Sequence, residues 1–562
     1  MDVLLPQTVQ KTMVTVRPRL FLRALKSRVP EEHSTTDLFS YTTGRWLWRE
    51  KEQLFERYRR FSVGELQAIT ARTLGSQACV SISKIGEGNF NKVFRLVMDD
   101  GAVAIARIPH PNAGPPRYTT MSEVATMEFV RSMLKIPVPK VLAWSSCSDN
   151  SVGAEYIIME EAKGTQLSQM WDEMKLHDRS EIIDDIVSIE QKLLSVTFGG
   201  YGSLYFAKDA FPGCQPADIS GDIAQGIKDE VRKQFVIGPT TRREFWEKER
   251  ALMNLDRGPW KSASGYVESI AHREIAWISQ YARRDSIMSG YPRGKGSQKS
   301  PQDHIALLEK YLSVVSRLLP DDTELVRPAL WHPDIHDGNI FTQDGRISSL
   351  IDWQSVWIAP LLLQARTPRL IDYHGEIQLR LPEDFKTLPE EERDRVRDQV
   401  QRSIQVYLYE DRTARVNPLL DRAIRKPHGK TLAQLVSFAG NSWDDHIVPL
   451  RDTLIDVERD WPKIFESGEC PYRFSHEERS EHGEESKGYG AAQAFWERLQ
   501  SRVQSDGWTT VEDFDDAVEY FSQLREAGLA SLEGDERDEF EAWTRFVEAR
   551  RAERDEQVCD RY

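Results

Sequence analysis

One eleven-residue segment constrains what this chain can fold into more than any other part of it. The segment is Trp331–Phe341, WHPDIHDGNIF. It contains a His-x-Asp-x4-Asn pattern made by His332, Asp334 and Asn339, and Asp352 follows thirteen residues after Asn339. In a chain of 562 residues, a chance match to this pattern has odds on the order of a few per cent. A long helix is predicted before the segment and short strands around it, which indicates a loop that carries polar residues.

These residue types suit phosphoryl transfer. That reaction needs a cradle for the phosphates, a cation beside them, Mg²⁺, and a residue that orients or deprotonates the attacking hydroxyl. Asp334 is predicted to accept the hydroxyl proton. Asn339 and Asp352 are predicted to bind Mg²⁺ through oxygen atoms, the ligands that this cation prefers. His332 and His336 complete the catalytic candidates: His332 is expected to brace the loop, and His336 to contact the transferred phosphate.

The same segment has a second interpretation as a zinc or iron site. In an extended backbone, His332, Asp334 and His336 would project to one side, which suits three metal ligands. This interpretation leaves Asn339, Asp352 and the upstream glycine-rich segment without a role.

A glycine-rich segment, GEGNFNKVF at Gly86–Phe94, is the candidate phosphate cradle. Gly86 and Gly88 would let backbone N–H groups approach phosphate oxygens that a Cβ would obstruct. Asn89 lies in the same turn and is counted with the nucleotide-binding candidates. Asn91 stands where the protein-kinase loop has a third glycine. The alternative interpretation is an ordinary hairpin turn.

Three charged residues complete the predicted nucleotide side. Arg107, on the third predicted strand, can neutralise phosphate, although protein kinases use Lys there. Glu123, on a helix expected to start near Thr120, is its predicted partner. Thr120 and Glu123 also match a capping box, which is the structural alternative. Glu160, in the predicted strand Glu155–Glu161, is the last nucleotide-binding candidate.

The order of the predicted elements favours an α+β chain. Strand-like segments between residues 79 and 161 form an antiparallel meander, and helical patterns dominate from about residue 166. Tyr41–Phe61 is predicted to be a helix, and residues 200–300 a helical insert on the acceptor side. Thr509–Leu524 is predicted to be a helix with a capping box at Thr509 and Glu512. Candidate acceptor contacts in the insert, with simple packing as the alternative, are Asp256, Arg257, Glu274 and Trp277.

The composition limits the kinds of binding partner and the cellular compartment that we expect for this protein. The net charge of −15 disfavours nucleic acid, which clustered Lys and Arg bind. The five cysteines are scattered, which argues against a disulfide framework. No apolar run is long enough to predict a transmembrane helix. Residues 1–30 are basic with one acid, Asp2, which predicts a mitochondrial targeting segment over residues 1–35; a basic tail on a cytoplasmic protein is the alternative.

Several motifs resemble a known family. HPDIHDGN followed by IDWQ resembles the aminoglycoside phosphotransferase and choline-kinase-like family. EGNFNKVF, VGAEYIIMEEAKGTQL and DRGPW resemble its fungal branch, which includes the altered-inheritance-of-mitochondria proteins. The resemblance covers roughly residues 40–460. It implies a two-lobed protein-kinase-like fold with an antiparallel-sheet N-lobe and a mostly helical C-lobe, using ATP and Mg²⁺ with Asp334, Asn339 and Asp352.

The predicted organisation has four parts: a targeting segment (1–35), an N-lobe (40–165), a C-lobe (166–460) and an acidic helical C-terminal extension (461–562). The predicted function is ATP- and Mg²⁺-dependent transfer of a phosphoryl group to a hydroxyl of a small molecule. The alternative is a kinase-like scaffold or binding protein of the mitochondrion with weak or no catalysis. The acceptor and the oligomeric state are left open.

Overall fold

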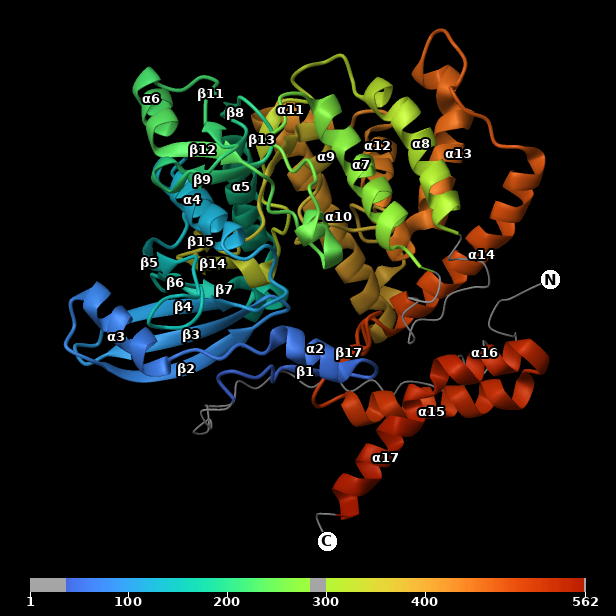
Figure 1. Ribbon diagram of the computed structural model, residues 1–562, viewed down its shortest axis with the longest axis horizontal. Coiled ribbons are helices and arrows are strands. Elements are labelled where there is room, and N and C mark those ends of the chain that lie inside the picture. The colour runs from blue at the N-terminus through green and yellow to red at the C-terminus, as the bar shows by residue number, and fades with distance from the viewer. Residues whose placement is uncertain (1–36, 284–299, 560–562) are drawn as a thin grey trace.

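The computed structural model describes residues 37–283 and 300–559. The predicted targeting segment therefore lies outside the described residues. Figure 1 shows an N-lobe built on an antiparallel sheet, a mostly helical C-lobe and a helical C-terminal extension. The predicted two-lobed, kinase-like α+β fold is confirmed. No helix in the described ranges is long and apolar enough to cross a membrane.

The N-lobe is a five-stranded antiparallel sheet in the order β2-β3-β4-β6-β5. Its strands are β2 (Cys79–Glu87), β3 (Asn91–Met98), β4 (Val103–Pro109), β5 (Val141–Ser145) and β6 (Tyr156–Met159). Alternation along β3 buries Phe94 and Leu96 on the face that helix α3 (Val63–Leu74) covers. The same alternation leaves the other face of the sheet for the site.

Helix α4 (Tyr118–Ser132) follows the sheet and begins earlier than predicted. Arg117 occupies the N-cap position, so Thr120 lies inside the helix, and its hydroxyl donates a hydrogen bond to Glu155 at 2.7 Å. The capping box of Thr120 and Glu123 is therefore wrong. Glu123 is free to face the sheet instead.

The predicted helix Tyr41–Phe61 is wrong in its first half. Strand β1 (Gly44–Trp46) pairs antiparallel with β17 (Trp508–Thr510), and only α2 (Glu50–Arg57) is helical. The aromatic spacing suggested a helix because the strand partner lies more than 450 residues away in sequence. Trp46 is fully buried, so the tail supplies the packing that a local pattern could not reveal.

The C-lobe packs its helices around two buried apolar clusters. Its long helices are α5 (Leu176–Leu193), α7 (Ala263–Tyr281), α8 (Pro301–Leu318), α10 (Glu390–Val416), α12 (Gly429–Gly440) and α13 (Ile447–Ile464). Shorter helices are α6 (Gln225–Gln234), α9 (Leu361–Gln364) and α11 (Pro418–Ile424). Small sheets lie between them, built from β7 (Thr165–Gln166), β8 (Thr197–Phe198), β9 (Ser203–Phe206), β10 (Gln215–Pro216), β11 (Ile219–Ser220), β12 (Phe235–Gly238), β13 (Pro328–Leu330), β14 (Ile340–Gln343), β15 (Arg346–Leu350) and β16 (Ile358–Pro360).

The helical insert predicted for residues 200–300 is therefore only partly correct. Strands β9, β10 and β12 form a three-stranded sheet in its first part, and within residues 200–283, the part of the insert that the structure describes, only α6 and α7 are helices of eight or more residues. All four residues of β12 are buried. A short apolar run that is buried on both faces has no periodicity that would separate a strand from a helix.

The C-terminal extension divides between the two ends of the molecule. Helix α14 (His476–Leu499) packs on α13, whereas α15 (Phe514–Ser531), α16 (Gly534–Thr544) and α17 (Phe546–Cys559) lie beside β1 and α2 (Figure 1). The predicted capping box of Thr509 and Glu512 is wrong, because Thr509 belongs to β17. Asp513 is the N-cap residue of α15 instead.

Candidate active site

The segment Trp331–Phe341, the candidate catalytic segment, follows β13, and His332 holds it in place. Its Nε2 lies 3.0 Å from the carbonyl oxygen of Ile351, and its Nδ1 accepts a hydrogen bond from the backbone N–H of Asp334 at 3.2 Å. The ring packs edge-on against Trp353, with centroids 4.7 Å apart. Burial lowers the pKa of His332, so the ring is neutral and Nε2–H donates to Ile351. These contacts fit the predicted bracing role.

Asp334, Asn339 and Asp352 converge, as the proposed chemistry requires. The side-chain nitrogen of Asn339 donates to the carbonyl oxygen of Asp334 at 3.0 Å, which leaves its Oδ1 as the acceptor atom. The N–H of Ile351 donates to the carbonyl oxygen of Asn339 at 3.0 Å, so Asn339 lies beside Asp352. Asp352 has a φ of 64°, a left-handed conformation that side chains rarely adopt. Such backbone strain is found most often at functional sites.

His336 lies beside Asp334. Its Nε2 is 3.6 Å from Asp334 Oδ2, and its Nδ1 accepts from the N–H of Gly338 at 3.0 Å. Both ring nitrogens of His332 are engaged by the backbone, so that residue has no atom left for a metal. No group of three or more His, Cys, Asp or Glu side chains within residues 37–283 and 300–559 is arranged to bind a metal ion. The zinc or iron interpretation therefore finds no support.

Arg107 connects the N-lobe to this cluster. It is buried on β4, forms an ion pair with Glu123 of α4, and places Nη1 3.6 Å from Asp352 Oδ1. Burial lowers the pKa of Arg107 to about 10, which still leaves it cationic at neutral pH. Its Nε is buried without an acceptor among the described residues. A buried donor of this kind indicates an absent ligand or water.

The glycine-rich hairpin presents backbone N–H groups. Gly88 N–H donates to the carbonyl oxygen of Asn91 at 3.0 Å, which closes the turn. The N–H groups of Asn89 and Phe90 have no acceptor in the described part of the chain. A Cβ on Gly88 would meet nothing within 4 Å, and one on Gly86 would meet Val93 only at 3.8 Å. Packing inside the protein therefore does not explain either glycine.

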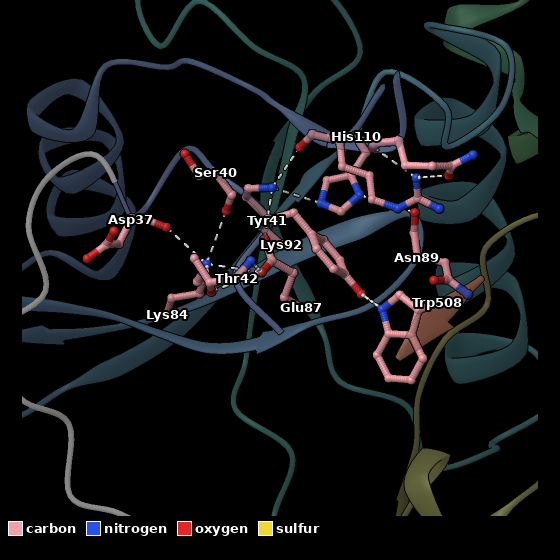
Figure 2. A network of polar contacts seen from close by, with 12 residues as sticks. Asp37, Ser40, Tyr41, Thr42, Lys84, Glu87, Asn89, Lys92, His110 and Trp508 are labelled. Atoms are coloured by element: carbon pink, nitrogen blue, oxygen red, sulfur yellow. Dashed lines mark hydrogen bonds and ion pairs between the residues drawn. The ribbon is translucent and has the colours of Figure 1, made fainter. Parts of the chain in front are cut away.

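A buried polar network, which the sequence did not reveal, anchors this hairpin (Figure 2). His110 donates from Nδ1 to the carbonyl oxygen of Asn89 at 3.2 Å, and its N–H donates to that of Phe90 at 2.8 Å. Its Nε2 accepts from Lys92 Nζ at 3.0 Å. Burial, and then the Lys92 ammonium, lower the pKa of His110 to about 3. The ring is neutral and fixes the carbonyl group of Asn89, while the backbone N–H of His110 fixes that of Phe90.

The network continues toward both ends of the chain. Lys92 is fully buried and pairs with Glu87 at 2.9 Å, and Thr42 donates its N–H to Glu87 at 2.7 Å. Next to Thr42, the Tyr41 hydroxyl accepts from Trp508 Nε1 at 3.0 Å (Figure 2). The C-terminal extension thus reaches the base of the candidate phosphate cradle through four residues.

Asn91, which stands where the protein-kinase loop has a third glycine, makes a contact that a glycine could not make. Its side-chain nitrogen donates to Gln354 Oε1, in the IDWQ segment that follows Asp352. Gln354 in turn donates to the carbonyl oxygen of Ala113 at 2.9 Å. The departure from the kinase loop therefore supplies a contact between the lobes at the site.

Glu160 does not join the cluster. Its carboxylate accepts from the N–H of Lys140 at 3.2 Å, and its own N–H donates to the carbonyl oxygen of Lys140 at 2.9 Å. It lies at the end of β6 and is exposed. Its nucleotide-binding role stays a prediction.

The four predicted acceptor contacts are engaged within the C-lobe: Asp256, Arg257, Glu274 and Trp277. Glu274 is fully buried and pairs with Arg250 at 2.8 Å. Asp256 accepts from Trp260 Nε1 at 2.9 Å, and Arg257 donates to the carbonyl oxygen of Phe245 at 3.2 Å. The packing alternative accounts for these contacts.

Two other arginines, missed from sequence, lie beside Asp334 instead. Arg369 Nη1 is 2.8 Å from Asp334 Oδ1, and Arg366 donates to the carbonyl oxygen of Pro333. Both follow α9, and the N–H of Leu370 donates to the carbonyl oxygen of Ile335 at 3.1 Å, which ties that stretch to the catalytic segment. No local motif marks them, because they lie more than thirty residues after Asp334.

Comparison with known proteins decides the family. The sequence profile of the phosphotransferase enzyme family (APH) matches residues 81–363 of this chain. The chain belongs to the phosphotransferase enzyme family. The resemblance inferred from its motifs is confirmed.

Curated relatives match a longer part of the chain. A subtelomeric hrmA-associated cluster protein of Aspergillus fumigatus is 32% identical over 80% of this chain and 92% of its own length. Altered inheritance of mitochondria protein 9, mitochondrial, is 26% identical in Yarrowia lipolytica, over 78% of this chain and 79% of that protein. The Saccharomyces cerevisiae protein of the same name is 24% identical over 85% of this chain and 87% of its own length.

Solved structures resemble the chain more distantly. One is aminoglycoside phosphotransferase APH(4)-Ia with ADP and hygromycin B, at 14% identity and a TM-score of 0.35, covering 70% of this chain and 98% of that chain. Another is APH(2″)-IIa with streptomycin and ATP, at 11% identity and a TM-score of 0.36, covering 71% of this chain and 98% of that chain.

Proposed function

We propose that this family member transfers the γ-phosphoryl group of ATP to a hydroxyl of a small molecule. One observation carries the proposal: Asp334, Asn339 and Asp352 converge, and Arg107 reaches Asp352 from the N-lobe. Phosphoryl transfer depends mainly on positioning and on stabilising charge, and this arrangement can supply both.

Each residue has a role in this proposal. Asp334 orients the acceptor hydroxyl and takes its proton, while His332 holds the backbone of Asp334 in place. His336, 3.6 Å from Asp334, is positioned to contact the transferred phosphoryl group. Asn339 and Asp352 offer the oxygen ligands that suit Mg²⁺, which when bound neutralises phosphate charge.

The nucleotide side fits a triphosphate. Arg107 places Nη1 3.6 Å from Asp352, and the N–H groups of Asn89 and Phe90 have no acceptor among the described residues. Gly86 and Gly88 leave room for phosphate oxygens to approach the backbone.

A thermal-shift experiment tests the nucleotide part. Mg²⁺ with ATP should raise the unfolding temperature of the wild type, because a ligand that binds only the folded state stabilises it. Asp352→Ala should lose most of the magnesium-dependent part of that shift. Asp344→Asn, in the exposed turn between β14 and β15, is the control that keeps it. If Mg²⁺ with ATP causes no shift in the wild type, the proposal fails.

A binding protein without catalysis is the second candidate. Two observations favour it: Arg replaces the usual Lys at Arg107, and Asp334 Oδ1 is engaged by Arg369. Transfer of phosphate that disappears in Asp334→Asn would refute it. ATP binding without transfer to any acceptor or to water would support it.

We further propose that the protein is mitochondrial. The altered-inheritance-of-mitochondria relatives are named as mitochondrial proteins, and residues 1–30 are basic with one acid, Asp2. Residues 1–35 fused to a fluorescent reporter should direct it to mitochondria. A diffuse signal would contradict the proposal.

A further inference from the structure

Two arginines lie on the acceptor side of the candidate site. Arg369 and Arg366 both lie against the catalytic segment, one on the carboxylate of Asp334 and the other on the carbonyl oxygen of Pro333. The side chain of Arg369 is 66% exposed, although it pairs with a residue at the centre of the site. A cationic acceptor, such as an aminoglycoside, would be repelled by this pair.

Two carboxylates lie close to the pair. Asp334 and Asp372 both act on the charge of Arg366, and the Asp372 carboxylate also lies 3.4 Å from His374. Asp334 is assigned to the reaction, so Asp372 is the carboxylate that remains beside the two guanidinium groups.

We propose that the acceptor carries an anionic group, a carboxylate or a phosphate, close to its reacting hydroxyl, and that Arg369 and Arg366 bind that group. This inference rests on the proposed function. The planar guanidinium fork binds both anions through two parallel hydrogen bonds. An exposed ion pair such as that of Arg369 with Asp334 is weak, so an incoming anion can replace Asp334 as its partner.

This exchange also explains how Asp334 becomes available as a base. A carboxylate oxygen held by a guanidinium is a poor proton acceptor, because the nearby positive charge favours its ionised form. When the acceptor anion draws Arg369 away, Asp334 Oδ1 is released beside the hydroxyl. The acceptor oxygen then bonds to the γ-phosphorus, the bond from that phosphorus to the β,γ-bridging oxygen breaks, and ADP leaves. The hydroxyl proton passes to Asp334.

A charge-sorted screen tests the inference with the full-length protein. A yeast small-molecule extract is separated at pH 7 into anionic, neutral and cationic pools. Each pool is incubated with the protein, Mg²⁺ and ATP labelled with ¹⁸O in its γ-phosphoryl group, and mass spectrometry detects labelled products. We expect products from the anionic pool only. Prior phosphatase treatment of that pool removes them if the anion is a phosphate and leaves them if it is a carboxylate.

Variants show whether Arg369 binds the anion of the acceptor or only positions Asp334. Arg369→Gln should raise KM for the labelled acceptor about 10- to 100-fold, the usual effect of one charge-assisted hydrogen bond. Its thermal shift with Mg²⁺ and ATP, which reports on the nucleotide side, should stay close to that of the wild type. Arg346→Gln, which removes an exposed arginine paired with Asp185 on the surface, is the matched control and should change neither.

Three outcomes would overturn the inference. Products from the neutral or cationic pool would refute an anionic acceptor while supporting the proposed transfer. No product in any pool, with Mg²⁺ and ATP still bound, would refute the transfer function and this inference with it. An equal loss of hydrolysis and transfer in Arg369→Gln would show that Arg369 only positions Asp334.

Discussion

Two arginines approach the candidate site from opposite lobes, and their surroundings differ. The side chain of Arg107 is 10% exposed and pairs with a fully buried glutamate, whereas that of Arg369 is 66% exposed and pairs with Asp334. A buried histidine anchors the backbone on each side, His110 at the glycine-rich hairpin and His332 at Asp334, so the difference between the two sides lies in the arginine side chains. Burial fixes the groups that face the nucleotide, and exposure lets those facing the acceptor exchange partners.

The largest expected effect is a loss of the transfer rate without a loss of stability, on the side of the site that faces the acceptor. Asp334→Asn should lower the rate of phosphate transfer about 10²- to 10⁴-fold, because it removes the general base. Affinity for ATP and the free energy of unfolding should change little, since Asp334 is partly exposed. Quenched-flow kinetics and urea unfolding measure these quantities. Asp344→Asn, at a turn with a φ of 52° that Asn also adopts, is the control.

The second largest effect is the difference in stability between breaking a buried ion pair and breaking an exposed ion pair of the N-lobe. Glu123→Gln leaves Arg107 buried without its counter-charge and should lower the free energy of unfolding by about 3–5 kcal/mol. Glu161→Gln breaks the exposed pair with Arg95 and should cost about 0–1 kcal/mol. Urea unfolding of both variants measures the difference. Equal losses of unfolding free energy in the two variants would show that burial does not make the pair of Arg107 and Glu123 more important than the exposed pair.

A pH experiment probes the anchor of the hairpin. The pKa of His110 is about 3 in the folded chain and near 6.5 when unfolded. The unfolded chain therefore binds the extra proton between these values, so the contribution of His110 is full above about pH 6.5 and declines as the pH falls. Going from pH 7 to 5.5 should cost about 1 kcal/mol.

The control for that experiment is His110→Gln, which should lose less stability over the same interval. The groups that face His110 are Lys92 and Arg57, which favour the neutral ring, and Glu87, which opposes them. Urea unfolding at both pH values decides the question. An identical pH dependence in the variant would show that His110 does not cause the loss of stability at low pH.

The smallest effect concerns the connection to the C-terminal extension. Tyr41→Phe removes the acceptor of Trp508 Nε1–H and should lower the free energy of unfolding by about 0.5–1.5 kcal/mol. KM for ATP should rise slightly, while KM for the acceptor stays constant. Tyr407→Phe, an exposed tyrosine on α10, is the control. A change in acceptor KM alone would contradict the division between the two sides.

The features that were predictable from sequence depend on short spacings. His332, Asp334 and Asn339 lie within eight consecutive residues, so one loop fixes their geometry whatever surrounds it. The strands that carry the glycines and Arg107 were visible from alternation and turn residues. The contact of Arg107 with Glu123 could be proposed because the kinase-like order of elements implied it.

The features that were missed depend on residues distant in sequence. Trp46 looked helical because its strand partner follows residue 500. His110 is a lone histidine after a strand, and only folding brings Lys92 and the Asn89 carbonyl to it. Arg369 reaches Asp334 across thirty-five residues without any periodic pattern. Long-range contacts leave no local signature in a single sequence.

The pairing of β1 with β17 has a consequence for synthesis. Residues 44–46 leave the ribosome more than 450 residues before their partners, residues 508–510. At about 5–20 residues per second, the first strand is made on the order of half a minute before the strand that pairs with it. The hydrogen bond from Trp508 to Tyr41 therefore forms only after residue 508 has been made, so the hairpin of a nascent chain lacks part of its support until then.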